Sequence, residues 1–300
     1  MKFTPKGIIP AMVTPFDKNY NLDEEGIKRV INHVLKGNVH GVFISSSQGE
    51  FWALTKKEKH RLFQITVDHI DGKIPIYAGT GAESTLETIE LTQVAQDVGV
   101  DAASIITPYF VKPNEAELLN HYIKIANKVD MPILVYNNPD RTGVHISPKM
   151  LEALCEECNN VVGIKDSSGN LTNTSDYINR CGDKISVLSG TDTLILATLI
   201  YGGKGAIAAC ANVVPKLIVN IYDKFTSGNI KEAFQSQREL MPLRLAFSLG
   251  SFPVVIKEAL NMMGISVGPC RDPILPVTTE NRQKILKVLK DLGVEVTNTP

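Results

Sequence analysis

The residue that most directly suggests chemistry is Lys165, near the end of a short apolar stretch at residues 161–166. The stretch is β-branched, and polar residues bound it at 159–160 and 167–169, so it is typical of a strand buried on both faces. A buried ammonium is costly, and an apolar pocket favours the neutral amine, which attacks carbonyl carbons and forms imines. The alternative is a lysine just past the strand whose ammonium reaches water.

Four other polar residues and one glycine end or follow apolar stretches of the same kind, namely Ser47, Gln48, Tyr109, Tyr136 and Gly190. A lysine and two phenols that meet at one site would suit carbonyl chemistry, because a phenol can relay the protons that imine formation requires. Each tyrosine taken alone is better explained as a core residue with a hydrated hydroxyl. The interpretation therefore depends on a fold that gathers the strand ends.

Arg141 follows the second of these tyrosines by five residues, and its guanidinium could clamp a substrate carboxylate through two parallel hydrogen bonds. The alternative is a surface arginine that caps a loop.

The six histidines show no metal-ligand spacing, and the single C-x-x-C pair, Cys155 and Cys158, lacks the second pair that a structural zinc site needs. We therefore predict no metal.

Eight apolar stretches alternate with helical patterns along the first 226 residues, which predicts parallel strands joined by helical crossovers. Two of the helices begin with capping boxes, at Thr55 to Glu58 and at Ser84 to Glu87. The predicted strands cover residues 7–16, 39–45, 74–79, 102–107, 132–136, 161–166, 184–188 and 205–209.

Such a pattern fits either an open doubly wound sheet or a closed barrel. The first strand lacks the G-x-G-x-x-G motif of dinucleotide-binding sheets, and the count of eight favours a (β/α)8 TIM barrel. From about residue 215 onward the pattern is helical only. We predict a barrel over residues 1–226 and a C-terminal helical extension over 227–300, packed on the barrel. In a barrel the polar strand ends meet at one mouth.

Composition narrows the partners of this 300-residue chain. Its net charge of −1, with both signs interspersed, gives no electrostatic case for nucleic acid or an anionic membrane. No apolar run approaches 18 residues, and the N-terminal residues lack the apolar region of a signal peptide. The odd count of five cysteines suggests free thiols. We expect a cytoplasmic protein that binds small molecules.

Four stretches carry a family resemblance, and they are Ser47-Gln48-Gly49-Glu50, Thr107-Pro108-Tyr109, residues 136–143 and Gly163-Ile164-Lys165-Asp166. They are similar to motifs of the dihydrodipicolinate synthase / N-acetylneuraminate lyase family, and the likeness spans nearly the whole chain. The resemblance implies a class I aldolase-type barrel that forms a Schiff base with pyruvate. It further implies a homotetramer, built as a dimer of dimers, that needs neither a metal nor an organic cofactor.

The resemblance also assigns roles. Lys165 would form the Schiff base and Tyr136 would donate and accept protons. Ser47 would complete the proton relay with Tyr109, which in the synthases reaches across a subunit interface. Arg141 would hold the carboxylate of the second substrate. The remaining substrate contacts would come from Gln48, Ile207, Gly190, Gly49 and Glu50.

Gln48 departs from the family pattern, which commonly has a small hydroxyl-bearing pair before Gly49-Glu50. Because of Arg141, the leading expectation is 4-hydroxy-tetrahydrodipicolinate synthase activity, the condensation of pyruvate with aspartate semialdehyde in lysine biosynthesis. The longer amide of Gln48 keeps open an aldolase for a 2-keto-3-deoxy sugar acid or N-acetylneuraminate. A non-catalytic barrel that binds a keto acid is the alternative outside enzyme classes.

Overall fold

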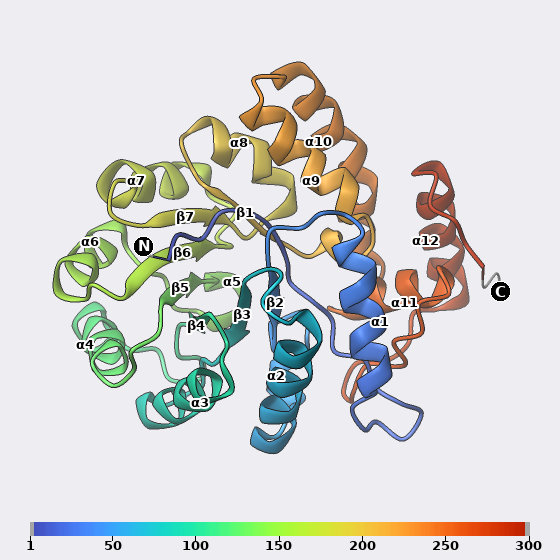
Figure 1. Ribbon diagram of the computed structural model, residues 1–300. Coiled ribbons are helices and arrows are strands. Elements are labelled where there is room, and N and C mark those ends of the chain that lie inside the picture. The colour runs from blue at the N-terminus through green and yellow to red at the C-terminus, as the bar shows by residue number, and fades with distance from the viewer. Residues whose placement is uncertain (1–2, 298–300) are drawn as a thin grey trace.

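The computed structural model describes residues 3–297, and its eight strands form the wall of a barrel surrounded by helices (Figure 1). The strands are paired in the order β1-β8-β7-β6-β5-β4-β3-β2, every pair is parallel, and a bridge between Ala11 and Phe43 joins β1 to β2. The predicted (β/α)8 barrel is confirmed. The strands are β1 (Gly7–Pro10), β2 (Val42–Ile44), β3 (Ile76–Gly79), β4 (Ala102–Ile106), β5 (Ile133–Asn137), β6 (Val161–Asp166), β7 (Ser186–Ser189) and β8 (Gly205–Ala208).

The first strand is shorter than predicted. Its pairing ends near Ala11, and Met12, Val13 and Phe16, which follow, belong to the larger, outer core cluster. There the backbone N–H of Val13 donates to Oδ1 of Asn212 at 3.1 Å. The continuous apolar pattern up to residue 16 therefore reflects burial outside the sheet, which periodicity alone does not distinguish from a buried strand.

The helices between the strands begin where their sequences provide caps. Thr55 and Glu58 form the predicted capping box, and Ser84 and Ser147 cap the helices that follow them. The helices of the barrel are α1 (Glu24–Leu35), α2 (Lys56–Ile70), α3 (Thr85–Val98), α4 (Glu115–Ala126), α5 (Pro139–Thr142), α6 (Pro148–Glu157), α7 (Leu171–Cys181), α8 (Ile195–Ile200) and α9 (Pro215–Thr226).

Three further helices, α10 (Ile230–Leu245), α11 (Val254–Met262) and α12 (Thr279–Asp291), follow the barrel. Figure 1 shows α10 beside α9, and α11 and α12 lie on the same side of the molecule as α1. In residues 3–297 no single helix is long and apolar enough to cross a membrane, although the bent pair 230–249 and 254–262 would qualify by length and composition taken together.

The core has two layers separated by the barrel wall. A small inner cluster fills the barrel with side chains such as Ile9, Phe43, Leu134 and Ile207, and a larger cluster lies between the strands and the helices. Strand residues alternate between these layers. A side chain on the inner face near the carboxyl end of a strand therefore faces the mouth of the barrel.

Candidate active site

Lys165 points into the barrel because of an irregularity in β6. Ile133 pairs with Val161, but the next residue of β5, Leu134, pairs with Gly163, so β6 contains one extra residue at this point. Val161 belongs to the outer cluster, so strict alternation would turn Lys165 outward as well. The extra residue is a β-bulge that reverses the faces, placing Ile164 outside and Lys165 inside.

The amine of Lys165 is enclosed by aromatic rings. The residue is only 4% exposed, and its Nζ lies 3.9 Å from the ring centroid of Tyr136 and 5.0 Å from that of Phe43. Tyr136 is the direct neighbour of Lys165 in the β5–β6 pairing, so the two side chains leave the barrel wall side by side. A nucleophile and a potential proton carrier therefore share one buried site.

The phenol of Tyr136 is the centre of a hydrogen-bond network. Its oxygen accepts a bond from Nδ2 of Asn138 at 2.8 Å, and the hydroxyls of Ser47 and Ser167 also bond to it. Burial raises the pKa of Tyr136, but the charge of Lys165 and these hydrogen bonds outweigh burial, so the pKa lies below its ordinary value. These contacts hold the phenol oxygen beside the amine of Lys165.

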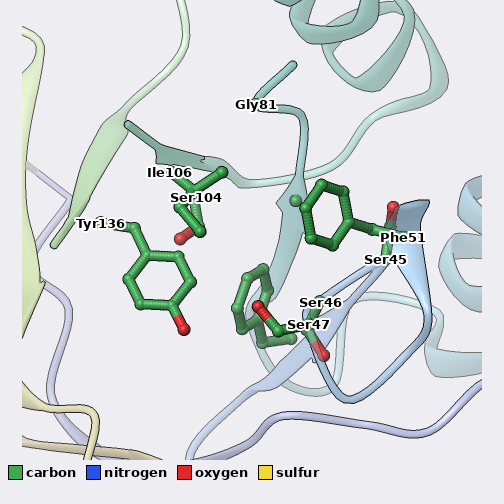
Figure 2. Close-up of a pocket in the computed structure, with 10 residues that line it drawn as sticks. Ser45, Ser46, Ser47, Phe51, Gly81, Ser104, Ile106 and Tyr136 are labelled. Atoms are coloured by element: carbon green, nitrogen blue, oxygen red, sulfur yellow. The ribbon is translucent and has the colours of Figure 1, made fainter. Parts of the chain in front are cut away.

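A cavity of about 770 Å³ opens above these residues at the carboxyl ends of the strands. A side pocket of about 10 Å³ adjoins it and shares Ser47 and Tyr136. Figure 2 shows Tyr136 reaching from its strand toward the segment that carries Ser45, Ser46 and Ser47. The large cavity brings together seven of the predicted site residues, Lys165, Tyr136, Ser47, Gln48, Arg141, Gly190 and Ile207.

Two of the cavity residues, Gly190 and Gln48, have surroundings that bear on their residue type. A Cβ on Gly190 would lie 2.0 Å from Oγ of Ser167, so a side chain there would displace a hydroxyl that bonds to Tyr136. Gln48 is 4% exposed, and its Oε1 has no hydrogen-bond partner in the described part of the chain. An unpartnered buried amide beside a cavity is a group whose hydrogen bonds a ligand can complete.

Arg141 lies on the short helix α5, and its guanidinium is 4.8 Å from the ring centroid of Phe252. Phe252 belongs to the segment between α10 and α11, so the C-terminal extension supports the arginine. Within residues 3–297, Arg141 forms no ion pair. Its charge is therefore available to an anion that enters the cavity.

Tyr109 is not among the residues that line the cavity. Its ring packs edge-on against Phe51 with centroids 5.9 Å apart. Burial, and then the neighbouring carboxylate of Glu83, raise the pKa of Tyr109. The next residue, Phe110, is 94% exposed and has a φ of +74°. Tyr109 itself is half-buried, and both Phe110 and Val111 of this loop are exposed. The role of Tyr109 in a proton relay across a subunit interface stays a prediction.

Gly49 and Glu50 also lie away from the cavity lining. A Cβ on Gly49 would come within 3.0 Å of the carbonyl oxygen of Met12. Glu50 is fully buried, and its Oε1 lies 2.7 Å from Nζ of Lys257 on α11. Neither residue lines the cavity, and the carboxylate of Glu50 is paired with Lys257. Their contact with substrate stays a prediction.

The structure adds cavity residues that we did not predict. Asn138 and Ser167 lie within the stretches that carry the family resemblance or directly beside them, and their polar types at a strand end were an available signal. Arg244 and Phe252 come from the C-terminal extension, where the sequence pattern is simply helical.

No group of three or more His, Cys, Asp or Glu residues within 3–297 is arranged to hold a metal ion.

Comparison with known proteins gives the same assignment as the geometry. Residues 4–292 match the model of the dihydrodipicolinate synthetase family. The chain belongs to this family. The resemblance predicted from the motifs is thereby confirmed.

Members of the family that match over nearly their full length include two named 4-hydroxy-tetrahydrodipicolinate synthase. The protein from Methanopyrus kandleri is 37% identical, covering 98% of each chain, and that from Methanothrix thermoacetophila is 40% identical, covering 96% of this chain and 97% of the relative.

Solved structures agree closely with the fold. A dihydrodipicolinate synthase from Aquifex aeolicus superposes with a TM-score of 0.95 at 32% identity, over 98% of this chain and 100% of that one. YagE, a prophage protein of the same family from E. coli K12 solved with pyruvate, gives a TM-score of 0.93 at 32% identity, over 96% and 99%.

Proposed function

We propose that this protein is a Schiff-base-forming lyase that condenses pyruvate with aspartate semialdehyde, as a 4-hydroxy-tetrahydrodipicolinate synthase. The observation that carries the proposal is the buried amine of Lys165 against the ring of Tyr136 at the floor of the cavity. The names of the full-length relatives support the choice of reaction, and the related prophage protein was solved with pyruvate.

In the proposed reaction, the neutral amine of Lys165 attacks C2 of pyruvate and forms a carbinolamine. Tyr136 donates a proton to the departing hydroxyl, so water leaves and the imine forms, and Ser47 and Asn138 orient the phenol. Loss of a proton from C3 gives the enamine, which attacks the aldehyde carbon of the second substrate. The amino group of aspartate semialdehyde then attacks the imine carbon, which closes the ring, displaces the amine of Lys165 and releases the product.

Arg141 supports a second substrate that carries a carboxylate, because its guanidinium lines the cavity and forms no ion pair with residues of 3–297. An aldolase for a 2-keto-3-deoxy sugar acid or N-acetylneuraminate is the second candidate. Two observations favour it, the unpartnered amide of Gln48 and a polar outer wall that includes Arg244, Ser248 and Ser251. These groups could bind the hydroxyls of a sugar chain.

One experiment separates the candidates. Borohydride is added to the purified protein with pyruvate, and the reduced adduct is mapped by mass spectrometry. Turnover is then measured in a coupled assay with pyruvate and aspartate semialdehyde, beside a panel of sugar acids. An adduct at Lys165 with turnover of the semialdehyde supports the synthase, whereas turnover of a sugar acid alone supports the aldolase. Absence of any adduct would contradict both and leave a keto-acid-binding barrel.

We further propose a homotetramer, built as a dimer of dimers, in the cytoplasm. Exposed apolar side chains support an assembly, and the cysteines of residues 3–297, none of which is in a disulfide, fit a reducing compartment. The barrel would occupy residues 1–226 and the extension 227–300. Light scattering of the purified protein tests the tetramer. The exposed apolar residues include Trp52, Leu86, Phe110 and Val111.

A further inference from the structure

The segment 45–50, between β2 and the 3₁₀ helix η1 (Phe51–Ala53), carries Ser47 and Gln48 to the cavity. Its two end residues, Ser45 with φ of +49° and Glu50 with φ of +55°, have left-handed backbone conformations. Residues other than glycine adopt this conformation at a cost, and it persists only where the surroundings hold it. The segment must therefore be held in place by specific contacts.

Some of these contacts come from residues of the barrel part of the chain, Thr14 and Ser46. The hydroxyl of Thr14 donates to the carbonyl oxygen of Gly49 at 2.6 Å, and the N–H of Gly49 donates to Oγ of Ser46 at 3.1 Å. Both bonds are buried. They fix the middle of the segment but leave its end at Glu50 to other contacts.

The end at Glu50 is held by the C-terminal extension. Oε1 lies 2.7 Å from Nζ of Lys257 on α11, and Oε2 accepts the backbone N–H of Arg271 at 2.8 Å. Lys257 also donates to the carbonyl oxygen of Pro269 at 2.7 Å, and its Nζ lies 4.3 Å from the ring centroid of Phe16. The side chains of Lys257 and Glu50 are 2% and 0% exposed, so solvent does not weaken this pair.

We propose that Glu50 and Lys257 are positioning residues, which hold segment 45–50 in the conformation that brings the hydroxyl of Ser47 to Tyr136. A buried ion pair contributes little net stability because both charges lose their hydration, but its geometry is strict. The pair is thus suited to selecting one conformation of a strained segment. Through Lys257, the C-terminal extension thereby acts on catalysis by way of segment 45–50.

The test compares Glu50→Gln with a matched control. Glu50→Gln keeps the volume and an acceptor for the N–H of Arg271, but it removes the charge that faces Lys257. The control is Glu58→Gln, because Glu58 is a second carboxylate bonded to Arg271, through the guanidinium. It is less buried than Glu50 and lies on α2 outside the segment. If Glu50→Gln does not fold, Glu50→Gln/Lys257→Met removes both charges and avoids an unpaired buried ammonium.

The first measurement is hydrogen exchange of the backbone amides of residues 45–50, which does not depend on the proposed function. We expect exchange in this segment to accelerate in Glu50→Gln and in the double variant, and to stay at the wild-type rate in Glu58→Gln. Unchanged exchange in Glu50→Gln, or in the double variant if only that one folds, would overturn the inference. If the wild-type protein forms no pyruvate adduct, the proposed function fails while this measurement remains decisive.

The second measurement rests on the proposed function and follows the rate of adduct formation at saturating pyruvate. We expect a loss of about 100-fold in Glu50→Gln, the effect of misplacing a catalytic group by roughly 1 Å. Because Ser47 would already be misplaced, adding Ser47→Ala should then cost little more. A rate that recovers in the double variant, or a full additional loss from Ser47→Ala, would show that the pair only stabilises the fold.

Discussion

Replacing Arg141 by alanine tests how this protein chooses its second substrate. The guanidinium lines the cavity, lies 4.8 Å from the ring centroid of Phe252, and forms no ion pair with any residue of 3–297. A substrate carboxylate would therefore bind it without displacing a protein carboxylate. The substitution removes that contact and leaves the imine-forming residues in place.

The size of the effect follows from the interaction that is lost. A hydrogen bond to a charged group contributes about 1.5–3 kcal/mol. Each 1.36 kcal/mol corresponds to about tenfold in rate, so kcat/KM for aspartate semialdehyde should fall about 10- to 150-fold. Because Arg141 is exposed, solvent weakens the contact and the loss should lie toward the lower end. Arg141→Lys should recover only part of it, since an ammonium lacks the bidentate fork.

The assay couples product formation to a reductase and varies aspartate semialdehyde at saturating pyruvate. Arg238→Ala is the matched control, because Arg238 is also exposed and lies 5.9 Å from the ring centroid of Phe234, yet it is outside the cavity lining. We expect the control to keep wild-type kinetics. An equal loss in pyruvate adduct formation would make Arg141 a structural loop residue. No loss with aspartate semialdehyde would remove the main reason for preferring the synthase.

Three further outcomes are expected. Lys165→Arg should abolish the borohydride-trapped pyruvate adduct, because a guanidinium stays protonated, and an adduct that persists would place the nucleophile elsewhere. Tyr136→Phe should lower turnover by about 10²–10⁴-fold with little change in thermal stability, and wild-type turnover with chemistry rate-limiting would refute the proton-transfer role. The hydrogen bonds from Arg271 hold the pKa of Glu58 at about 2, below its ordinary value of 4.5. A lowered carboxyl pKa stabilises the fold above pH 4.5 and ceases to do so as the pH falls toward about 2. The difference in unfolding free energy between wild type and Glu58→Gln, from denaturant titrations, should shrink over that range, and a constant difference would contradict the assignment.

Local sequence signals determined the order and type of the elements. Capping boxes such as Thr55 to Glu58 start helices through contacts between residues three apart, and apolar runs bounded by polar residues mark strands. Such signals act over a few residues and are therefore readable without the fold. The alternation of eight strands with helices was enough to predict the barrel, and the barrel was enough to expect Tyr136 and Lys165 at one mouth.

Contacts between distant segments could not be predicted in this way. Glu50 belongs to a motif that suggested substrate binding, yet its partner, Lys257, lies on a helix whose sequence shows only an apolar pattern. The support that Phe252 gives to Arg141 likewise depends on how the extension folds back over the barrel. Nothing in the local sequence of either residue specifies which distant surface it will meet.

The direction of the Lys165 side chain shows most clearly what the sequence determines and what only the tertiary structure decides. Its residue type and its place at the end of an apolar run come from the sequence alone, and they sufficed to single it out. Strict alternation from Val161, an outer-layer residue, would have turned it toward the helices. The bulge opposite Ile133 and Leu134 reverses the faces and turns the amine inward. Register is set by pairing with the neighbouring strands, so only the tertiary structure decided that this lysine faces the cavity.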